Sequence, residues 1–180
     1  MTEWSRIARR IRVPLGFAFA AFYVWIARPS CLSLALGTMV AVPGILLRAL
    51  ASGHVKKNQE VTTSGPYAYT RNPLYLGSII LVIGFGVASR NLWLAVALLM
   101  IFIALYLPVI RDEENFLRMR FPEFTDYAER VPRIVPRLSP SDSPAGFSSD
   151  LYRKHREYNA ALGSVGMMIL LILKLHFLSR

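Results

Sequence analysis

The chain has 180 residues, of which 54% are hydrophobic and 18% are charged, and its formal net charge is +10. Soluble domains carry about 25% charged residues, so this composition excludes an ordinary soluble domain. The single cysteine, Cys31, excludes an internal disulfide and a cysteine-rich zinc site. His54, His155 and His176 lie in different regions without ligand spacing, and we expect no metal centre.

Five apolar segments predict an all-α polytopic membrane protein. A helix needs about 20 apolar residues to cross a hydrocarbon core of about 30 Å. The candidate spans are residues 13–27, 32–50, 74–89, 91–110 and 160–178, the first and third of them short. Arginines precede the first segment, as in a secretion signal, but no small-residue cleavage site follows it. We therefore expect a retained helix.

The basic residues predict how these spans are oriented. With a cytosolic N-terminus, alternating loops place 17 of the 21 Lys and Arg residues inside and leave Arg28, Arg90, Lys174 and Arg180 for the other side. This distribution is the positive-inside pattern. We expect a cytosolic N-terminus, a C-terminus on the opposite side, and a location in a bacterial inner membrane. The basic residues are expected to contact anionic membrane lipids and not nucleic acid.

A tight turn at Ser89, Arg90 and Asn91 predicts that the third and fourth spans form an antiparallel hairpin. Gly77, Gly84 and Gly86 in the third span are expected to allow close approach of a neighbouring helix. Because the chain crosses and returns, the polar segments on either side of this hairpin should emerge on the same membrane face.

The first of these polar segments, residues 64–77, leads into the third span. Asn72 and Pro73 fit the N-cap and first position of a helix, where the unpaired N–H groups also suit an anionic or acceptor-rich ligand. Tyr67, Tyr69 and Tyr75 crowd beside Arg71 at the water boundary. Interfacial tyrosines are common in membrane proteins, so this excess fits either an ordinary boundary or a binding site.

The second polar segment, residues 111–136, follows the fourth span. The helix is expected to continue past Ile110 to about Phe121, because Pro122 disfavours helical geometry in the preceding residue. A short amphipathic helix over residues 123–130 would carry Phe124 and Tyr127. The prolines in residues 131–136 predict an extended strap across a pocket.

Glu113 and Glu114 are the residues of this segment that point most directly to a function. One interpretation is a solvated helix end, with Glu114 and Arg118 spaced for a weak surface pair. Alternatively, adjacent carboxylates near a bilayer require a cation, and an ammonium or sulfonium of a small molecule would supply one. From the residues alone we expect a cytosolic polar site for a small charged ligand.

Several short motifs follow one another along the chain. They are Gly-Pro-Tyr at residues 65–67, Asn-Pro-x-Tyr-x-Gly at 72–77, a hairpin, Glu-Glu at 113–114, Tyr127, and Val-Pro-Arg at 131–133. The pattern resembles the integral-membrane methyltransferases, which include isoprenylcysteine carboxyl methyltransferases and phospholipid N-methyltransferases. The resemblance implies a methyltransferase core over residues 1–138 with a cytosolic cap at 111–138. Residues 139–180 would then add a linker and an extra span.

The resemblance also implies an S-adenosylmethionine site at the cytosolic ends of the third and fourth spans. The residues that match the cofactor-binding positions are Tyr67, Arg71, Asn72, Pro73, Leu74, Tyr75, Glu113, Glu114 and Tyr127. Either Glu113 or Glu114 would receive the methionine ammonium, and Arg111 and Arg133 would act as catalytic residues on the cofactor carboxylate or an acidic acceptor. The acceptor would be lipid-like or isoprenoid.

Two departures from the family pattern matter. Many relatives have histidine where this chain has Asn72, and asparagine cannot act as a general base near neutral pH. The C-terminal span is the other departure, and it would either close the lipid side of the pocket or form a homodimer contact. The alternatives to a methyltransferase are an NADPH-dependent enzyme resembling sterol reductases and a non-catalytic membrane scaffold.

Overall fold

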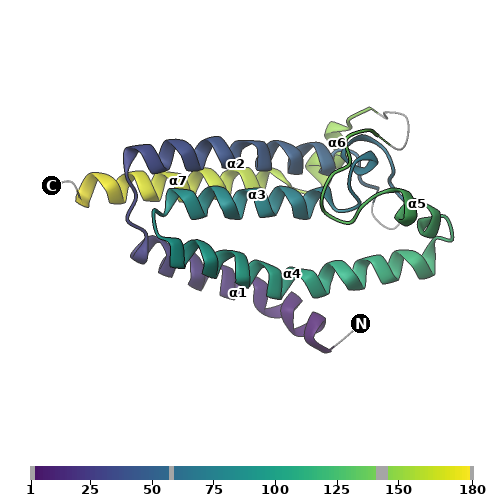
Figure 1. Cartoon of the computed structure of the whole chain (residues 1–180), viewed down its shortest axis with the longest axis horizontal. Helices are drawn as coiled ribbons and strands as arrows, with labels where there is room; N and C mark the ends of the chain where they lie inside the picture. The colour runs from purple at the N-terminus through teal and green to yellow at the C-terminus, as the bar shows by residue number, and fades with distance from the viewer. Residues whose placement is uncertain (1–2, 57–58, 141–145, 179–180) are drawn as a thin grey trace.

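The computed structural model describes residues 3–56, 59–140 and 146–178, and this part of the chain is helical without strands. The predicted all-α class is confirmed. The helices are α1 (Glu3–Ile26), α2 (Cys31–Ser52), the 3₁₀ turn η1 (Gly65–Ala68), α3 (Pro73–Ala88), α4 (Leu92–Arg120), α5 (Phe124–Arg130), α6 (Ser149–Lys154) and α7 (Tyr158–Leu178). The long helices run side by side along the longest axis of the molecule (Figure 1).

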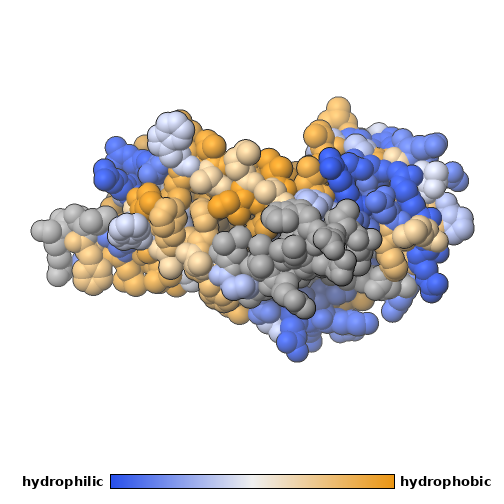
Figure 2. All heavy atoms as spheres, turned by 90° about the horizontal axis from the view of Figure 1, so that it is seen from below, coloured by the Kyte–Doolittle hydropathy of each residue, from blue (hydrophilic) through white to orange (hydrophobic). Residues whose placement is uncertain are grey.

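Within the described residues, three helical segments are long and apolar enough to cross a membrane, namely Cys31–Ser52, Leu92–Arg120 and Tyr158–Phe177. Gly16–Ile26 and Pro73–Ala88 are shorter apolar helices. Each of the five apolar segments is therefore helical, while the predicted number of crossings stays a prediction. In the view of Figure 2, a hydrophobic band occupies the middle of the molecule, between hydrophilic ends.

The hairpin and the cap follow the predicted boundaries closely. Asn91 accepts a hydrogen bond from Leu94 N and caps α4, which then runs without interruption to Arg120. Phe121 is extended because Pro122 follows it, and α5 begins at Phe124. The helix that contains the first predicted span is longer than the apolar run, since α1 begins at Glu3 and includes the arginines that precede that run.

Glycines bring α2 and α3 into backbone contact. A Cβ built on Gly77 would lie 2.8 Å from the carbonyl oxygen of Gly44, and one built on Gly84 would lie 2.8 Å from that of Gly37. Gly86 faces α4 instead, at 3.0 Å from the Cβ of Ala95. The expectation that these glycines allow close helix approach is confirmed. The close contact with α2 positions α3, the first helix of the hairpin.

Replacing Gly84 with leucine is expected to destabilise the protein by about 1–3 kcal/mol, because overpacking forces the two backbones apart. Thermal unfolding in detergent measures this effect. Gly166→Leu on α7 is the matched control, since a Cβ at Gly166 meets nothing within 4 Å. Equal melting temperatures for the two variants would contradict the close α2–α3 contact.

The C-terminal helix packs against α1 and α2 of its own chain. Leu171 is fully buried, and Lys174 Nζ donates hydrogen bonds to the carbonyl oxygens of Val24 and Trp25, each at 2.6 Å. At the other end of α7, Glu157 forms an ion pair with Arg48 of α2 at 2.8 Å. These contacts tie α7 to the bundle, whereas the predicted homodimer contact and the division at residue 138 stay predictions.

Candidate functional site

The two polar segments meet at one end of the molecule, which we call the cap end. It comprises η1, the start of α3, the last turns of α4, α5 and residues 131–137 (Figure 1). Side-chain contacts join the segments directly, among them those of Asn72 with Glu114 and of Tyr75 with Glu113. The expectation that the hairpin brings distant polar segments together is confirmed.

Glu114 is the centre of a buried network that we call the Glu114 network, formed with Arg71, Asn72 and Arg133. Its side chain is 4% exposed. Asn72 Nδ2 donates to Glu114 Oε1 at 2.9 Å. Arg133 Nε and Nη2 approach Glu114 Oε2 at 3.0 and 2.8 Å, and Arg71 Nε lies 3.5 Å from Oε1. The guanidinium groups of Arg71 and Arg133 therefore compensate the negative charge of Glu114.

Asn72 and Pro73 occupy the N-cap and the first position of α3, as expected. The side chain of Asn72 nevertheless makes no capping hydrogen bond, because its amide is engaged by Glu114 and by the carbonyl oxygen of Arg133 at 3.1 Å. The interpretation of Glu114 as a solvated residue paired with Arg118 was wrong. Glu114 points into the cap, while the Arg118 guanidinium lies over the ring of Phe124 at 5.6 Å from its centroid.

The predicted strap, residues 131–136, lies with Arg137 against residues 69–72, where hydrogen bonds to the backbone hold it, and its place across a pocket stays a prediction. Arg71 N donates to the carbonyl oxygen of Pro132 at 2.9 Å, and Arg137 N donates to that of Tyr69 at 3.0 Å. The Thr70 hydroxyl donates to the carbonyl oxygens of Arg133 and Ile134 at 3.1 Å. The strap thus fixes the loop that precedes α3.

Arg71 and Tyr127 connect α5 to the same loop. Arg71 Nη1 donates to the carbonyl oxygen of Ala128 at 3.0 Å. Burial lowers the pKa of Arg71, and the adjacent Glu114 opposes this shift. The buried Tyr127 donates its hydroxyl proton to the carbonyl oxygen of Tyr67 at 2.8 Å. Both side chains point into the interior of the cap, which is the geometry of positioning residues.

The other carboxylate, Glu113, lies on an open surface of the cap end. It is exposed, and its Oε2 accepts a hydrogen bond from the Tyr75 hydroxyl at 2.9 Å. In the described part of the chain, no lysine, arginine or histidine forms an ion pair with it. Among the described side chains, Glu113 thus presents a negative charge that no basic group neutralises.

Tyr67 and Tyr75 lie near this carboxylate. Burial raises the pKa of the Tyr67 phenol well above its usual range, and Tyr127, Glu113, Glu157 and Tyr75 raise it further, in that order. Tyr67 therefore stays protonated. The ring of Tyr75 makes an edge contact with Tyr106 of α4, with centroids 5.8 Å apart. We call Tyr67, Tyr75 and Glu113 the open cluster, after the exposed carboxylate of Glu113, while Tyr67 itself is buried.

The remaining predicted residues lie at different positions. Pro73 is fully buried at the first position of α3. Leu74 is half-buried, and its carbonyl oxygen accepts from Arg48 Nη1 at 3.3 Å. Arg111 is exposed and makes no hydrogen bond or ion pair within the described ranges. The structure does not join Arg111 to the other candidates.

Sequence reasoning missed the role of Arg48, which it counted only as a cytosolic charge. Its Nη2 donates to both carboxylate oxygens of Glu157 at 3.0 and 2.8 Å, and its Nη1 donates to Ser78. An arginine inside an apolar span is itself a signal, because such residues usually face the bundle interior and mark functional pathways.

A cavity of about 430 Å³ lies between α1, α3, α4 and α7, next to the open cluster. Most of its lining is apolar, and Arg48, Ser78, Tyr106 and Asn159 contribute polar groups toward the cap end. Tyr106 also contacts Tyr75. The cavity therefore adjoins the open cluster through the contact between the rings of Tyr106 and Tyr75.

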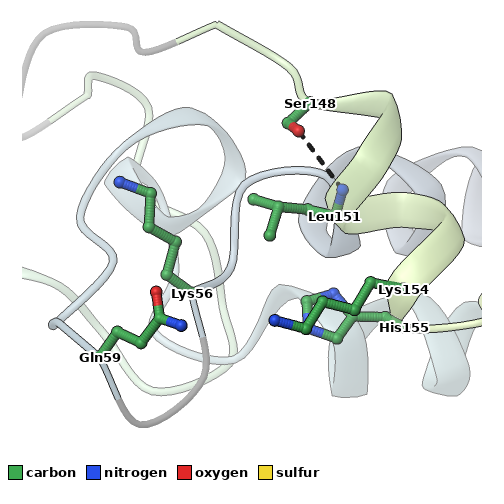
Figure 3. Close-up of a pocket in the computed structure, with 6 residues that line it drawn as sticks. All are labelled: Lys56, Gln59, Ser148, Leu151, Lys154 and His155. Atoms are coloured by element: carbon green, nitrogen blue, oxygen red, sulfur yellow. Dashed lines mark hydrogen bonds between the residues drawn. The ribbon is translucent and has the colours of Figure 1, made fainter.

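A second hollow of about 290 Å³ lies between α6 and the loop after α2. Figure 3 shows its lining, which includes Lys56, Lys154 and His155, and the hydrogen bond from Leu151 N to the Ser148 hydroxyl that caps α6. None of the predicted site residues lines it. The predicted binding of anionic lipids by basic residues stays a prediction here. In the described segments, no group of three or more His, Cys, Asp or Glu side chains is placed to hold a metal ion.

Comparisons with known proteins identify the family that this chain resembles. Residues 12–123 match the model of the phospholipid methyltransferase family. The chain is 38% identical over 130 residues to the nickel-cobalt-cadmium resistance protein NccN of Alcaligenes xylosoxydans xylosoxydans, covering 72% of this chain and 55% of that protein. It is 42% identical over 105 residues to the cobalt-zinc-cadmium resistance protein CzcN of Cupriavidus metallidurans, covering 58% and 48%.

The chain spans about half the length of these two relatives. No solved structure is significantly similar to it. The family model covers more than half of the chain, from within α1 to the residue before α5, and includes both carboxylates and the loop before α3. The chain belongs to the phospholipid methyltransferase family.

Proposed function

We propose that this protein transfers a methyl group from S-adenosylmethionine to a lipid-like acceptor at the cytosolic face of the membrane. The observation that carries the proposal is the exposed carboxylate of Glu113, which lies beside Tyr75 and forms no ion pair with the basic side chains that the structure describes. S-adenosylmethionine carries a cationic sulfonium and an ammonium, and it supplies a methyl group that is already activated for displacement. A carboxylate among aromatic rings suits such a cation.

Within this proposal Glu113 binds the methionine ammonium, because Glu114 is already engaged by Arg71 and Arg133. Tyr67, Tyr75 and the start of α3, with Pro73 and Leu74, border the nucleoside. The Arg133 side chain is 42% exposed, and its outer face is available for the cofactor carboxylate or an acidic acceptor. Arg111 is the alternative partner for that carboxylate. The Glu114 network and Tyr127 hold these groups in place.

The proposed chemistry asks little of the protein beyond orientation and exclusion of water. A lone pair on the acceptor oxygen or nitrogen forms the new bond to the methyl carbon, while the carbon–sulfur bond breaks and its electron pair stays on sulfur. A carboxylate acceptor needs no base, whereas a protonated amine must lose a proton first. Asn72 cannot take that proton, which favours an acceptor oxygen or an already neutral amine.

Ligand binding to the purified protein in lipid nanodiscs tests the proposal. We expect S-adenosylmethionine and its demethylated product, S-adenosylhomocysteine, to bind, and NADPH to bind more weakly or not at all. Calorimetry measures all three ligands. Failure of both adenosyl ligands would remove the methyltransferase function, and tighter binding of NADPH would favour the reductase-like alternative. Transfer of a labelled methyl group to a lipid extract would separate an enzyme from a scaffold.

The names of NccN and CzcN support a second, compatible proposal, that the protein contributes to tolerance of divalent metals. Methyl transfer to a membrane component would then be the activity on which tolerance depends. Expression of the wild-type protein in a metal-sensitive bacterial host should raise growth in cadmium or cobalt, and Glu113→Gln should not. Equal rescue by both would show that tolerance does not require the proposed site.

A further inference from the structure

We propose that the cavity between α1, α3, α4 and α7 binds the methyl acceptor, and that this acceptor is a carboxylic acid with a single long apolar chain. The inference rests on the proposed function and adds the class of acceptor to it. It also assigns α7, which lies beyond the residues matched by the family model, to the wall that surrounds the apolar chain.

The volume of the cavity favours a single chain. An apolar cavity of about 150 Å³ holds one benzene molecule, so a cavity of about 430 Å³ corresponds to roughly 15 to 20 carbon atoms. One acyl or isoprenyl chain fills this volume, and the second chain of a phospholipid would have to lie outside it. The deeper lining is apolar, with Phe85, Leu98 and Met167 among its residues.

Polar groups on the deeper wall are already satisfied by the protein. The Tyr23 hydroxyl donates to the carbonyl oxygen of Phe85 at 2.7 Å, and the Ser164 hydroxyl donates to that of Ala160 at 2.8 Å. The apolar end of a ligand would therefore meet no unpaired polar side chain there. This arrangement orients an amphiphile with its chain inward and its head toward the cap end.

The cap end of the cavity offers hydrogen-bond donors to an oxygen-bearing head. Arg48 Nε is buried and has no hydrogen-bond partner among the described residues. An unpartnered buried donor costs free energy that an acceptor atom of a ligand would recover. Asn159 and Tyr106 line the same end and carry further donors. A carboxylate accepts such bonds through two oxygens, whereas a protonated amine accepts none.

This end of the cavity also lies close to the open cluster. Tyr106 lines the cavity and contacts Tyr75, whose hydroxyl binds Glu113. Arg48 lines the same cavity, and its Nη1 donates to the carbonyl oxygen of Leu74, the residue before Tyr75. A carboxylate held near Arg48 would thus face the groups proposed to hold the methyl donor.

Two glycines of α7 supply a matched test. Gly163 lines the cavity and Gly166 does not, and a Cβ at either position meets nothing within 4 Å. Gly163→Phe should fill the cavity without disturbing helix packing, and Gly166→Phe should leave it open. Equal melting temperatures of the two variants in nanodiscs verify that both fold, and Gly163→Leu serves as a milder substitution if the phenylalanine variant melts lower.

The probe is a 16-carbon fatty acid with a diazirine in mid-chain, crosslinked by light in nanodiscs and mapped by mass spectrometry. We expect crosslinks to residues of the cavity wall in the wild type and in Gly166→Phe, and at least a fivefold reduction in Gly163→Phe. The same crosslink yield in both variants would overturn the proposal. Preferential labelling of the cavity by a diazirine phosphatidylethanolamine or by the corresponding fatty amine would overturn the assigned class.

The crosslinking needs no methyl donor, which separates this inference from the proposed function. Site-specific crosslinks in a protein that binds no S-adenosylmethionine would overturn methyl transfer and leave a lipid-binding cavity. Binding of S-adenosylmethionine without crosslinks that depend on Gly163 would sustain methyl transfer and overturn the cavity as its acceptor site. In turnover, Gly163→Phe should lose activity with a 16-carbon acid and keep its affinity for S-adenosylhomocysteine.

Discussion

Replacing Glu114 with glutamine is expected to cause the largest loss of stability of any single substitution at the cap end, about 3 kcal/mol. The Glu114 side chain is 4% exposed and the Arg71 side chain 10% exposed, so the substitution leaves a guanidinium in a buried setting without its counter-charge. Removal of one partner of a buried pair is costly for this reason. Denaturant unfolding in detergent, followed by tryptophan fluorescence, measures the change.

The pair of Lys56 and Glu60 provides the control for this experiment. These side chains are 48% and 55% exposed and are spaced i,i+4, and such surface pairs contribute a few tenths of a kcal/mol. Glu60→Gln should therefore leave the free energy of unfolding within about 0.5 kcal/mol of the wild type. A loss of the same size in Glu114→Gln would show that the network does not hold the cap together.

A double substitution separates charge imbalance from the loss of hydrogen bonds. If the uncompensated guanidinium groups dominate, Glu114→Gln combined with Arg133→Gln should unfold less readily than the sum of the single variants predicts. Arg71 must stay in this test, because it also bonds to the backbone of α5. Strict additivity would mean that the charges of Glu114 and Arg133 are not coupled.

Much of the fold could be predicted because the length of an apolar segment and the residues that begin and end a helix are local signals. Asn91 and Pro122 mark the ends of the long helix α4 through their own backbone preferences, and the hairpin then requires that both polar segments reach the same end. The start of α1 was not predictable in this way. Its first residues are basic and polar, and an apolar-length criterion does not detect a helix that begins outside the apolar run.

The contrast between the two adjacent carboxylates was not predictable from sequence. Glu113 and Glu114 are neighbours on one helix, and successive residues point in different directions around it. Which of them turns inward depends on where Arg71 and Arg133 arrive, and both arginines come from segments positioned by tertiary contacts. The ion pair between Arg48 and Glu157 was missed for the same reason, because its partners are far apart in the chain.

Replacing Glu113 with glutamine is expected to reduce affinity for S-adenosylmethionine and S-adenosylhomocysteine by about tenfold to a hundredfold. A hydrogen bond to a charged group contributes about 1.5–3 kcal/mol, and 1.4 kcal/mol corresponds to a tenfold change in affinity. Glutamine keeps an acceptor for the Tyr75 hydroxyl and removes only the charge. Because Glu113 is exposed, its substitution should leave the melting temperature near that of the wild type.

Glu129→Gln is the matched control for this substitution, since Glu129 is also an exposed cap carboxylate and lies on α5, away from the open cluster. It should bind both adenosyl ligands as the wild type does. An equal loss of affinity in both variants would point to a general effect of net charge at the cap end, and not to a contact made by Glu113.

A truncated ligand identifies the group that Glu113 recognises. 5′-Methylthioadenosine retains the nucleoside and lacks both the ammonium and the carboxylate of the methionine part, so Glu113→Gln should leave its affinity unchanged. Tyr67→Ala should weaken all three ligands, because Tyr67 is proposed to border the nucleoside. If Glu113→Gln weakens 5′-methylthioadenosine as strongly as S-adenosylhomocysteine, the carboxylate shapes the nucleoside pocket and does not bind the ammonium. The cation that Glu113 meets would then have to be sought on the acceptor.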